Sequence, residues 1–212
     1  MPRPSRWSEI LAAASEEFRE RGYDNATLEG IGARVGILKG SIYNYVGSKE
    51  ELLLAVVEQP AKQLLAELER LQADTGTSVA VRLREFVRMQ VRIFSEHHPA
   101  AFVYVAHIGR MTAPRFAEFR EMDAQYMRLV ESLVAEGART GEFSLAASPS
   151  TVARALVGMI DWMHHWFTPR GEQADRELAD QLFALALGGL VAGGGIREIA
   201  RSFPEPPVPD VR

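Results

Sequence analysis

Residues 27–49 read TLEGIGARVGILKGSIYNYVGSK, and this stretch decides the fold of the N-terminal part of the chain. It predicts two short helices joined by a tight turn at Gly36, which is a helix-turn-helix. Thr27 stands where a residue that caps the first helix is preferred. The second helix of such a motif exposes polar side chains while its apolar back packs on the first. Ile37 and Ile42 supply that back.

Helical periodicity continues on both sides of this motif. Apolar residues recur at three- and four-residue spacing, and no two-residue alternation typical of strands is present. Ser48 with Glu51 matches a capping box that starts a longer helix, which Pro60 is expected to kink or interrupt. Ser148-Pro149 marks the start of a helix that we expect to reach about Phe167. Further helices are expected over 79–96, 116–136 and 175–190.

The sequence therefore predicts an all-α protein, with an N-terminal three-helix helix-turn-helix domain and a C-terminal helical domain. The expected divisions are 4–58 for the first domain, with its motif at about 27–46, then 59–202 for the second, and 203–212 for a Pro-rich disordered tail.

Composition limits the classes of function. The chain has 212 residues, 24 Lys+Arg against 28 Asp+Glu and no cysteine, which excludes disulfides and thiolate chemistry and fits the cytoplasm. The sequence contains no run of eighteen apolar residues, so we expect no membrane span. A net charge of −4 means that any nucleic-acid contact needs a local basic surface. Arg34, Lys39 and Lys49 supply one, because residues 30–49 contain no acid.

The first fifty-odd residues resemble the DNA-binding domain of the TetR family of transcriptional regulators. The matching positions are Ile10-Leu11, Ala13-Ala14, Phe18, Gly22-Tyr23, Thr27, Ile31, Gly36-Ile37, Gly40, Ile42-Tyr43, Lys49-Glu50 and Leu52. The resemblance implies a homodimer that binds double-stranded operator DNA, and a divergent C-terminal domain whose ligand loosens that binding. Leu38 departs from the family pattern, since a Ser or Thr normally caps the recognition helix there, at a cost of about 1 kcal/mol.

The DNA-contacting residues follow from the resemblance, position by position. Those similar to phosphate-backbone contacts are Thr27, Tyr43, Tyr45 and Lys49. Those similar to positions near base edges are Lys39, Gly40, Ser41 and Asn44. The alternative is ordinary surface for Lys39 and Asn44, and partial core for Tyr43.

The C-terminal domain is expected to hold a small hydrophobic effector. The segments DWMHHWFTP (161–169) and LALGGL (185–190) are similar to a TetR subgroup that includes acyl-CoA-responsive repressors of lipid and steroid breakdown. The candidate pocket residues are Phe102, Tyr104, Met111, Met159, Trp162 and Trp166. Trp162 and Trp166 lie four apart, on one face of the expected helix, with Met159 three residues before Trp162. The alternative for all of them is plain hydrophobic core.

The last two helices are expected to form the dimer interface. The candidate residues are Val152, Leu156, Ile160, Leu182, Leu185 and Gly189, and the alternative is that they close the core of the monomer. We expect no metal site and no cofactor, because the histidine pairs offer too few ligands. No motif of an enzyme stands out. The predicted function is a ligand-responsive repressor that binds a pseudo-palindromic operator as a dimer, and the alternative is an effector-independent activator or architectural DNA-binding protein.

Overall fold

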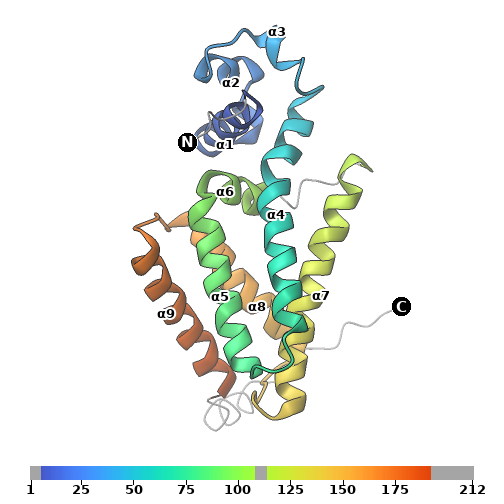
Figure 1. Ribbon diagram of the computed structural model, residues 1–212, viewed down its shortest axis with the longest axis vertical. Helices are drawn as coiled ribbons and strands as arrows, with labels where there is room; N and C mark the ends of the chain where they lie inside the picture. The colour runs from blue at the N-terminus through green and yellow to red at the C-terminus, as the bar shows by residue number, and fades with distance from the viewer. Residues whose placement is uncertain (1–5, 108–113, 192–212) are drawn as a thin grey trace, which may run out of the picture.

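The computed structural model describes residues 6–107 and 114–191, and every regular element in that part of the chain is a helix (Figure 1). The all-α prediction is therefore confirmed. The elements in chain order are α1 (Arg6–Asn25), α2 (Leu28–Arg34), α3 (Lys39–Ile42), α4 (Lys49–Ala73), α5 (Val79–Glu96), α6 (His98–His107), the 3-10 turn η2 (Pro114–Phe116), α7 (Ala117–Thr140), α8 (Pro149–Asp161), the 3-10 turn η3 (Trp162–His165) and α9 (Glu172–Val191). The predictions for Met111 and for the tail 203–212 lie outside the described residues.

Side-chain caps start the helices where the sequence indicates. The hydroxyl oxygen of Thr27 accepts a hydrogen bond from the backbone N–H of Gly30 at 3.0 Å, which starts α2. The hydroxyl of Ser48 accepts one from the N–H of Glu51 at 3.1 Å, which starts α4. Ser148 caps α8 in the same way. Each cap satisfies one backbone donor that the first turn of a helix leaves without a partner.

The helix α4 runs without interruption through Pro60, so the break expected there as one of two outcomes is wrong. A proline inside a helix costs roughly 3 kcal/mol relative to alanine. Packing on both sides of Pro60 offsets that cost. Leu53 and Val57 are buried in the N-terminal hydrophobic core, and Leu68 is buried in the C-terminal one. The long α4 thus connects the two parts of the molecule (Figure 1).

The N-terminal core is completed by residues from the C-terminal part. Besides side chains of α1 to α4, it contains Val103 of α6, Phe116 of η2 and Phe119 of α7. Val103 has no exposed surface. The helix α6 lies between the helix-turn-helix and the lower bundle and packs against α1 (Figure 1). The two parts therefore share apolar contacts at this point.

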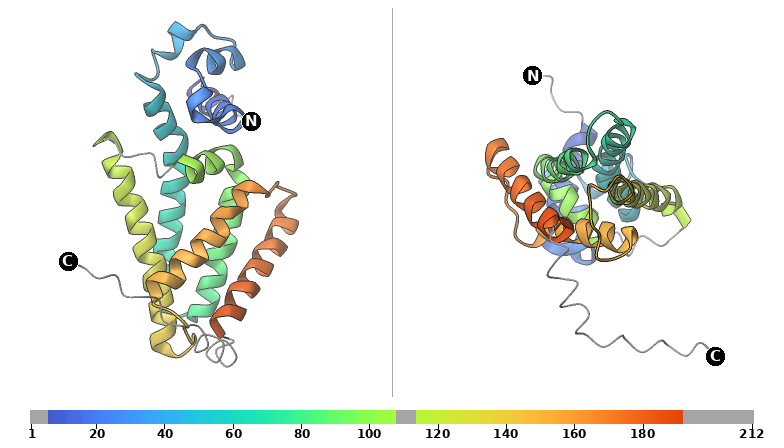
Figure 2. Two further views of the ribbon diagram at one scale, coloured as in Figure 1. Left: turned by 180° about the vertical axis from the view of Figure 1, so that it is seen from behind. Right: turned by 90° about the horizontal axis from the view of Figure 1, so that it is seen from below.

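Two arginines of α5 hold α9 in place through one carboxylate. The guanidinium groups of Arg84 and Arg88 each donate two hydrogen bonds to Asp180 of α9, at 2.7–3.0 Å. These bonds hold the pKa of Asp180 far below its usual range. Bidentate pairs of this kind fix orientation as well as position. The helix α9 therefore packs along α5. Seen from behind, α8 and α9 lie on the near side of the molecule (Figure 2, left).

The C-terminal end of α7 folds back on itself over Gly137. A Cβ atom added to Gly137 would lie 2.1 Å from Cδ2 of the buried Phe143 ring. The N–H of Phe143 also donates to the carbonyl oxygen of Gly137 at 3.0 Å, which fixes the ring over that position. Only glycine fits there without displacing the ring.

We therefore expect Gly137→Ala to lower the free energy of unfolding by several kcal/mol, because an overpacked core costs roughly 1–3 kcal/mol or more. Urea denaturation followed by circular dichroism measures it. Gly40→Ala is the matched control, since a Cβ at Gly40 meets no atom within 4 Å. Equal stability of the two variants would show that Phe143 does not need the space.

Candidate functional site

The turn between α2 and α3 is built on close backbone contact. Gly36 has a φ of 68°, in the left-handed region that favours glycine. The N–H of Ile37 donates to the carbonyl oxygen of Gly32 at 2.9 Å. A Cβ on Gly32 would lie 2.8 Å from the carbonyl oxygen of Ile37, so a larger residue there would displace the turn. Ile42 is fully buried and holds α3 against α2.

The predicted DNA-contacting residues gather on and just after α3. Gly40, Asn44 and both Tyr43 and Tyr45 are exposed, and Ser41 is half-buried. Lys39 is the first residue of α3, and its side chain is outside the described part. The helix α3 ends at Ile42, and residues 43–45 form a turn.

Lys49 lies at the start of α4, but its ammonium group is used inside the domain. Its Nζ donates to the carbonyl oxygens of Tyr23, Ala26 and Asp24, at 2.7, 3.1 and 3.3 Å. It also lies 4.4 Å from the centre of the Tyr23 ring. An ammonium group has three donors, so these carbonyls occupy all of them. In this structure Lys49 closes the C-terminal end of α1 and is not free to contact a phosphate.

Arg34 is also paired within the domain. Its guanidinium contacts Glu17, with Nε 2.7 Å from Oε2, and also Glu20. Glu17 is 1% exposed. The two carboxylates raise the pKa of Arg34, and Arg34 lowers that of Glu20. The local positive charge expected from Arg34, Lys39 and Lys49 is therefore smaller than the sequence indicates.

Two features of this surface were not predicted. Leu38 stands just before α3, makes no side-chain cap and is 82% exposed. Trp7 of α1 stacks on Tyr45, with parallel rings 6.3 Å apart between centres. The departure of Leu38 from the family pattern was visible in the sequence, but its exposure depends on the tertiary arrangement. The stacking joins residues 38 positions apart in the chain, and no local pattern indicates it.

In the C-terminal part, Trp162 and Trp166 do not line an internal pocket. Their exposed fractions are 60% and 51%. Trp162 stands four and seven residues after the exposed Gly158 and Ala155, so it follows the solvent side of α8, and α8 itself ends at Asp161 instead of reaching Phe167. The ring of Trp162 lies on that of His165, 3.9 Å between centres. The exposure of both tryptophans favours a surface position over the lining of a pocket, and Met159 is half-buried against the C-terminal core.

Phe102 and Tyr104, the other predicted pocket residues, are half-buried on α6. The Tyr104 hydroxyl donates to Oδ1 of Asp123 at 2.6 Å, and its ring packs edge-on against Phe119. A cavity of about 10 Å³ opens beside them, and its lining residues are Ala61, Leu64, Tyr104, Phe119, Met122, Asp123 and Tyr126. That volume holds about one water molecule.

Tyr104, Asp123 and Tyr126 line this cavity, and Gln90 and Asp161 interact with these side chains; we call the five residues the inner polar cluster. The Nε2 of Gln90 donates to the buried hydroxyl of Tyr126. Burial, and secondarily the Asp123 carboxylate, raises the pKa of Asp161 to about 7. Burial also raises the pKa of both tyrosines. Sequence reasoning found Tyr104 and missed the others, because a half-buried carboxylate on an amphipathic helix has no periodic signal.

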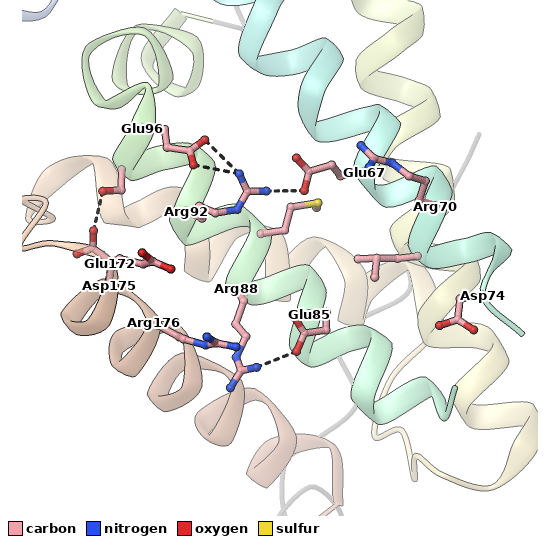
Figure 3. A pocket seen from close by; sticks show the side chains of 13 residues that line it. Glu67, Arg70, Asp74, Glu85, Arg88, Arg92, Glu96, Glu172, Asp175 and Arg176 are labelled. Atoms are coloured by element: carbon pink, nitrogen blue, oxygen red, sulfur yellow. Dashed lines mark hydrogen bonds and ion pairs between the residues drawn. The ribbon is translucent and has the colours of Figure 1, made fainter. Parts of the chain in front are cut away.

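A larger groove, of about 800 Å³, lies along α5 between α4 and α9 (Figure 3). Its lining is charged: Glu67, Arg70, Leu71, Asp74, Glu85, Arg88, Met89, Arg92, Ser95, Glu96, Glu172, Asp175 and Arg176. Arg92 binds Glu67 and Glu96, and Arg88 binds Glu85, so these charges largely neutralise one another. Six carboxylates against four arginines make the groove a poor site for a polyanion, and it is not the apolar cavity that was expected.

Three of the predicted dimer residues pack in the core of the monomer. Leu156, Ile160 and Leu182 are buried within the C-terminal core, which favours the alternative that they close the core of the monomer. Leu185 is 69% exposed, and Val152 is half-buried. Gly189 lies in the last turns of α9. The free surface of α8 consists of Thr151, Arg154, Ala155 and Gly158.

The described residues contain neither a group of metal ligands nor a membrane-spanning helix. No group of three or more His, Cys, Asp or Glu side chains there is placed to hold a metal ion. Among the same residues, no helix is both long and apolar enough to cross a membrane.

Comparison with known proteins covers both parts of the chain. Residues 10–56 match the model of "Bacterial regulatory proteins, tetR family", and 76–190 match "Tetracyclin repressor-like, C-terminal domain". The transcriptional repressor KstR2 of Mycobacterium tuberculosis H37Rv is 26% identical over 192 residues, which are 90% of this chain and 95% of KstR2. The structure of the ketosteroid transcriptional regulator KstR2 of M. tuberculosis superposes on this chain with a TM-score of 0.81 at 25% identity. The match covers 89% of this chain and 96% of that one.

A third protein shares the fold alone. AibR, solved in complex with isovaleryl coenzyme A and operator DNA, has a TM-score of 0.74 at 21% identity, covering 86% of this chain and 98% of that one.

Lys49 gives a prediction that separates a structural role from a purely DNA-contacting one. We expect Lys49→Ala to lower the melting temperature of the DNA-free protein, because three carbonyl groups at the end of α1 lose their donor. Differential scanning calorimetry measures it, with the exposed Lys62→Ala as control. A variant that melts like the wild type but binds DNA more weakly would return Lys49 to the phosphate-contacting set.

Asp161 gives a pH-dependent prediction. Its pKa is about 7 in the folded chain against an ordinary 3.8, so the folded state binds the proton more tightly than the unfolded state does. The carboxyl therefore lowers the free energy of unfolding as the pH rises from about 4 to about 7, by roughly 1.4 kcal/mol per unit of pKa difference. We expect Asp161→Asn to stabilise the protein more at pH 8 than at pH 5, in thermal melts at both.

Asp180→Asn is the control of opposite sign. Its pKa is lowered by Arg88 and Arg84, so its ionised form stabilises the fold, and the substitution should destabilise at both pH values. A pH-independent effect of Asp161→Asn would contradict the raised pKa.

Proposed function

Because the chain belongs to the TetR family of bacterial regulators, we propose that it is a ligand-responsive transcriptional repressor that binds a pseudo-palindromic operator as a homodimer. Release follows binding of a small hydrophobic effector, for which an acyl-CoA thioester is the first candidate. The observation that carries the proposal is the exposed surface of α3 and the turn after it, held by a buried helix-turn-helix core. We propose that it acts in the cytoplasm, and we propose no catalytic activity.

In this proposal, the start of α3 enters the major groove of the operator. Gly40 permits close approach, while Lys39 and Asn44 reach guanine and adenine. The hydroxyls of Tyr43 and Tyr45 donate to phosphates, which suits a surface with few free cations. In a dimer the two recognition helices would be one DNA turn apart, roughly 34–36 Å.

Neighbouring residues of α6 provide the connection between effector and DNA. Val103 is buried in the N-terminal core, and Tyr104 belongs to the inner polar cluster. A ligand that moves Tyr104 therefore displaces the helix that supports α1. The ligand can shift the equilibrium between the two arrangements only by the difference in its binding free energy for them. A ligand that binds both equally leaves the equilibrium unchanged.

The names of the relatives support the repressor and the effector class. KstR2 is named a repressor, and one structure of it a ketosteroid regulator. AibR, which shares the fold, has been solved with isovaleryl coenzyme A. One observation favours the alternative of an effector-independent activator or architectural protein: the cavity beside Tyr104 measures only about 10 Å³, so the core is nearly full.

A fluorescence-polarisation titration tests the proposal. The purified protein is titrated against DNA from upstream of its own gene at two salt concentrations, with and without a panel of acyl-CoA thioesters. We expect tight binding that one class of thioester releases. Binding that no thioester changes would favour the alternative, and absence of binding to this DNA would move the search to selection from random sequence.

The dimer interface is proposed to lie on the exposed surfaces of α8 and α9, where Leu185 is the large apolar residue. We expect Leu185→Glu to shift the protein from dimer to monomer in analytical ultracentrifugation, because an interface does not accept an unpaired buried charge. Gln59→Glu, an exposed position on α4, is the control and should remain dimeric. A dimeric Leu185→Glu variant would place the interface elsewhere.

We propose that the exposed Leu38 contacts a thymine methyl group, the apolar feature of the major groove. We expect that replacing one thymine per half-site by uracil, which lacks the methyl group, weakens binding of the wild type about 5- to 10-fold. This corresponds to a loss of roughly 1 kcal/mol of binding free energy. Leu38→Ser should be insensitive to the same replacement. Uracil scanning of an operator selected with the wild type measures this, and no uracil-sensitive position would exclude the contact.

A further inference from the structure

The ring of Tyr45 is supported by a residue from the first helix of the chain. Tyr45 lies in the turn that follows α3, and Trp7 belongs to the first turn of α1. Their rings are parallel to within 7°, with 6.3 Å between the ring centres. Aromatic pairs attract one another in offset arrangements at centre distances of roughly 4.5–7 Å. The contact therefore joins the start of α1 to the end of the DNA-contacting segment.

Trp7 is the anchored member of this pair. Its side chain is half-buried and packs against the N-terminal hydrophobic core, and Ile10, three residues further along α1, has no exposed surface. The Tyr45 side chain is 45% exposed. The N–H of Tyr45 donates to the carbonyl oxygen of Ile42 at 2.8 Å, which fixes its backbone but not the direction of its ring. The stacked indole restricts that direction.

The Tyr45 hydroxyl is available as a donor. It makes no hydrogen bond to any residue that the structure describes. Ordering a side chain on binding costs free energy, and a group that is already held in its bound orientation avoids that cost. Because Arg34 and Lys49 are paired inside the domain, neutral donors have a larger part in binding phosphates. The orientation of the Tyr45 hydroxyl therefore matters for the affinity.

Tyr43 offers a comparison within the same turn. It follows α3 directly and is 51% exposed, so its exposure is close to that of Tyr45. Within the described part of the chain, no aromatic ring contacts that of Tyr43. The turn thus carries two exposed tyrosines, of which only Tyr45 is held by a second ring.

We propose that Trp7 is a positioning residue for operator binding, because its ring fixes the phenol of Tyr45 in the direction from which the hydroxyl donates to a DNA phosphate. The inference rests on the proposed function, since it adds a residue of α1 that acts through the DNA-contacting surface. The aromatic ring of Trp7 carries this role and its indole N–H does not. Phenylalanine can therefore replace Trp7, and alanine cannot.

A double-mutant cycle tests this, with fluorescence polarisation on an operator that the wild type has selected from random sequence. We expect Trp7→Ala and Tyr45→Phe each to weaken binding about 10-fold, the effect of losing one hydrogen bond to a charged group. Trp7→Phe keeps a ring and should stay within about 2-fold of the wild type. In the Tyr45→Phe background, Trp7→Ala should cost less than about 2-fold, because the hydroxyl that it positions is already absent.

Two further variants separate positioning from loss of structure. Leu11→Ala truncates another half-buried apolar side chain of α1 in the same core, and should lower the melting temperature while affinity changes less than about 2-fold. In the Tyr43→Phe background, Trp7→Ala should keep its effect of about 10-fold, because Tyr43 is not stacked on Trp7. Circular dichroism melts verify that each variant is folded at the temperature of the titration.

Acrylamide quenching of tryptophan fluorescence tests the ring contact in the DNA-free protein. The chain has three tryptophans, so Trp162→Phe combined with Trp166→Phe leaves Trp7 as the only one. In that background, Tyr45→Ala should uncover one face of the indole and raise the quenching constant. Tyr43→Ala removes an equal ring from the same turn and should leave the quenching constant unchanged.

Wild-type affinity of Trp7→Ala for DNA that the wild type selects would overturn the proposal. So would an undiminished effect of Trp7→Ala in the Tyr45→Phe background, or a quenching constant that Tyr45→Ala does not change. A loss in Trp7→Phe as large as in Trp7→Ala would also overturn it, and would give the indole N–H a direct contact instead. Failure of the wild type to select any DNA would reject the proposed function, and this inference with it.

Discussion

The insertion of Val103 into the N-terminal core is the contact on which the rest of the arrangement depends. Val103 belongs to α6, yet it is fully buried among side chains of the helix-turn-helix part. Phe116 and Phe119 enter the same core from η2 and α7. The N-terminal part therefore cannot reorient on α4 alone without exposing apolar surface that α6 and α7 supply. In the proposed function, this shared core transmits a movement of the C-terminal bundle to the surface that contacts DNA.

Periodicity and caps were sufficient for most helices. Thr27, Ser48 and Ser148 all start helices as expected, because capping is a local interaction between residues three apart. The interruption at Pro60 was wrong, since contacts of Leu53 and Leu68 with two separate cores decide the outcome there. Local chemistry thus predicts where a helix begins better than where it continues.

The candidate sites were less predictable, because burial is a property of the tertiary fold. Leu156 and Leu182 have the spacing of an interface and pack inside the monomer. Trp162 has the apolar character of a pocket residue, yet it lies on the solvent side of α8, four residues after the exposed Gly158. Asp123 and Asp161, by contrast, lie on amphipathic helices where a carboxylate is usually solvated, and nothing local distinguishes them from surface residues.

The internal pairing of Arg34 and Lys49 has a consequence for how this protein would distinguish its operator from other DNA. Binding through cations releases condensed counterions from any duplex, whatever its sequence. Here Glu17 and Glu20 engage one cation, and carbonyl groups at the end of α1 engage the other. These two residues therefore contribute less of that sequence-independent attraction. Base contacts and groove shape would carry a larger share of the affinity, and non-specific DNA would compete less.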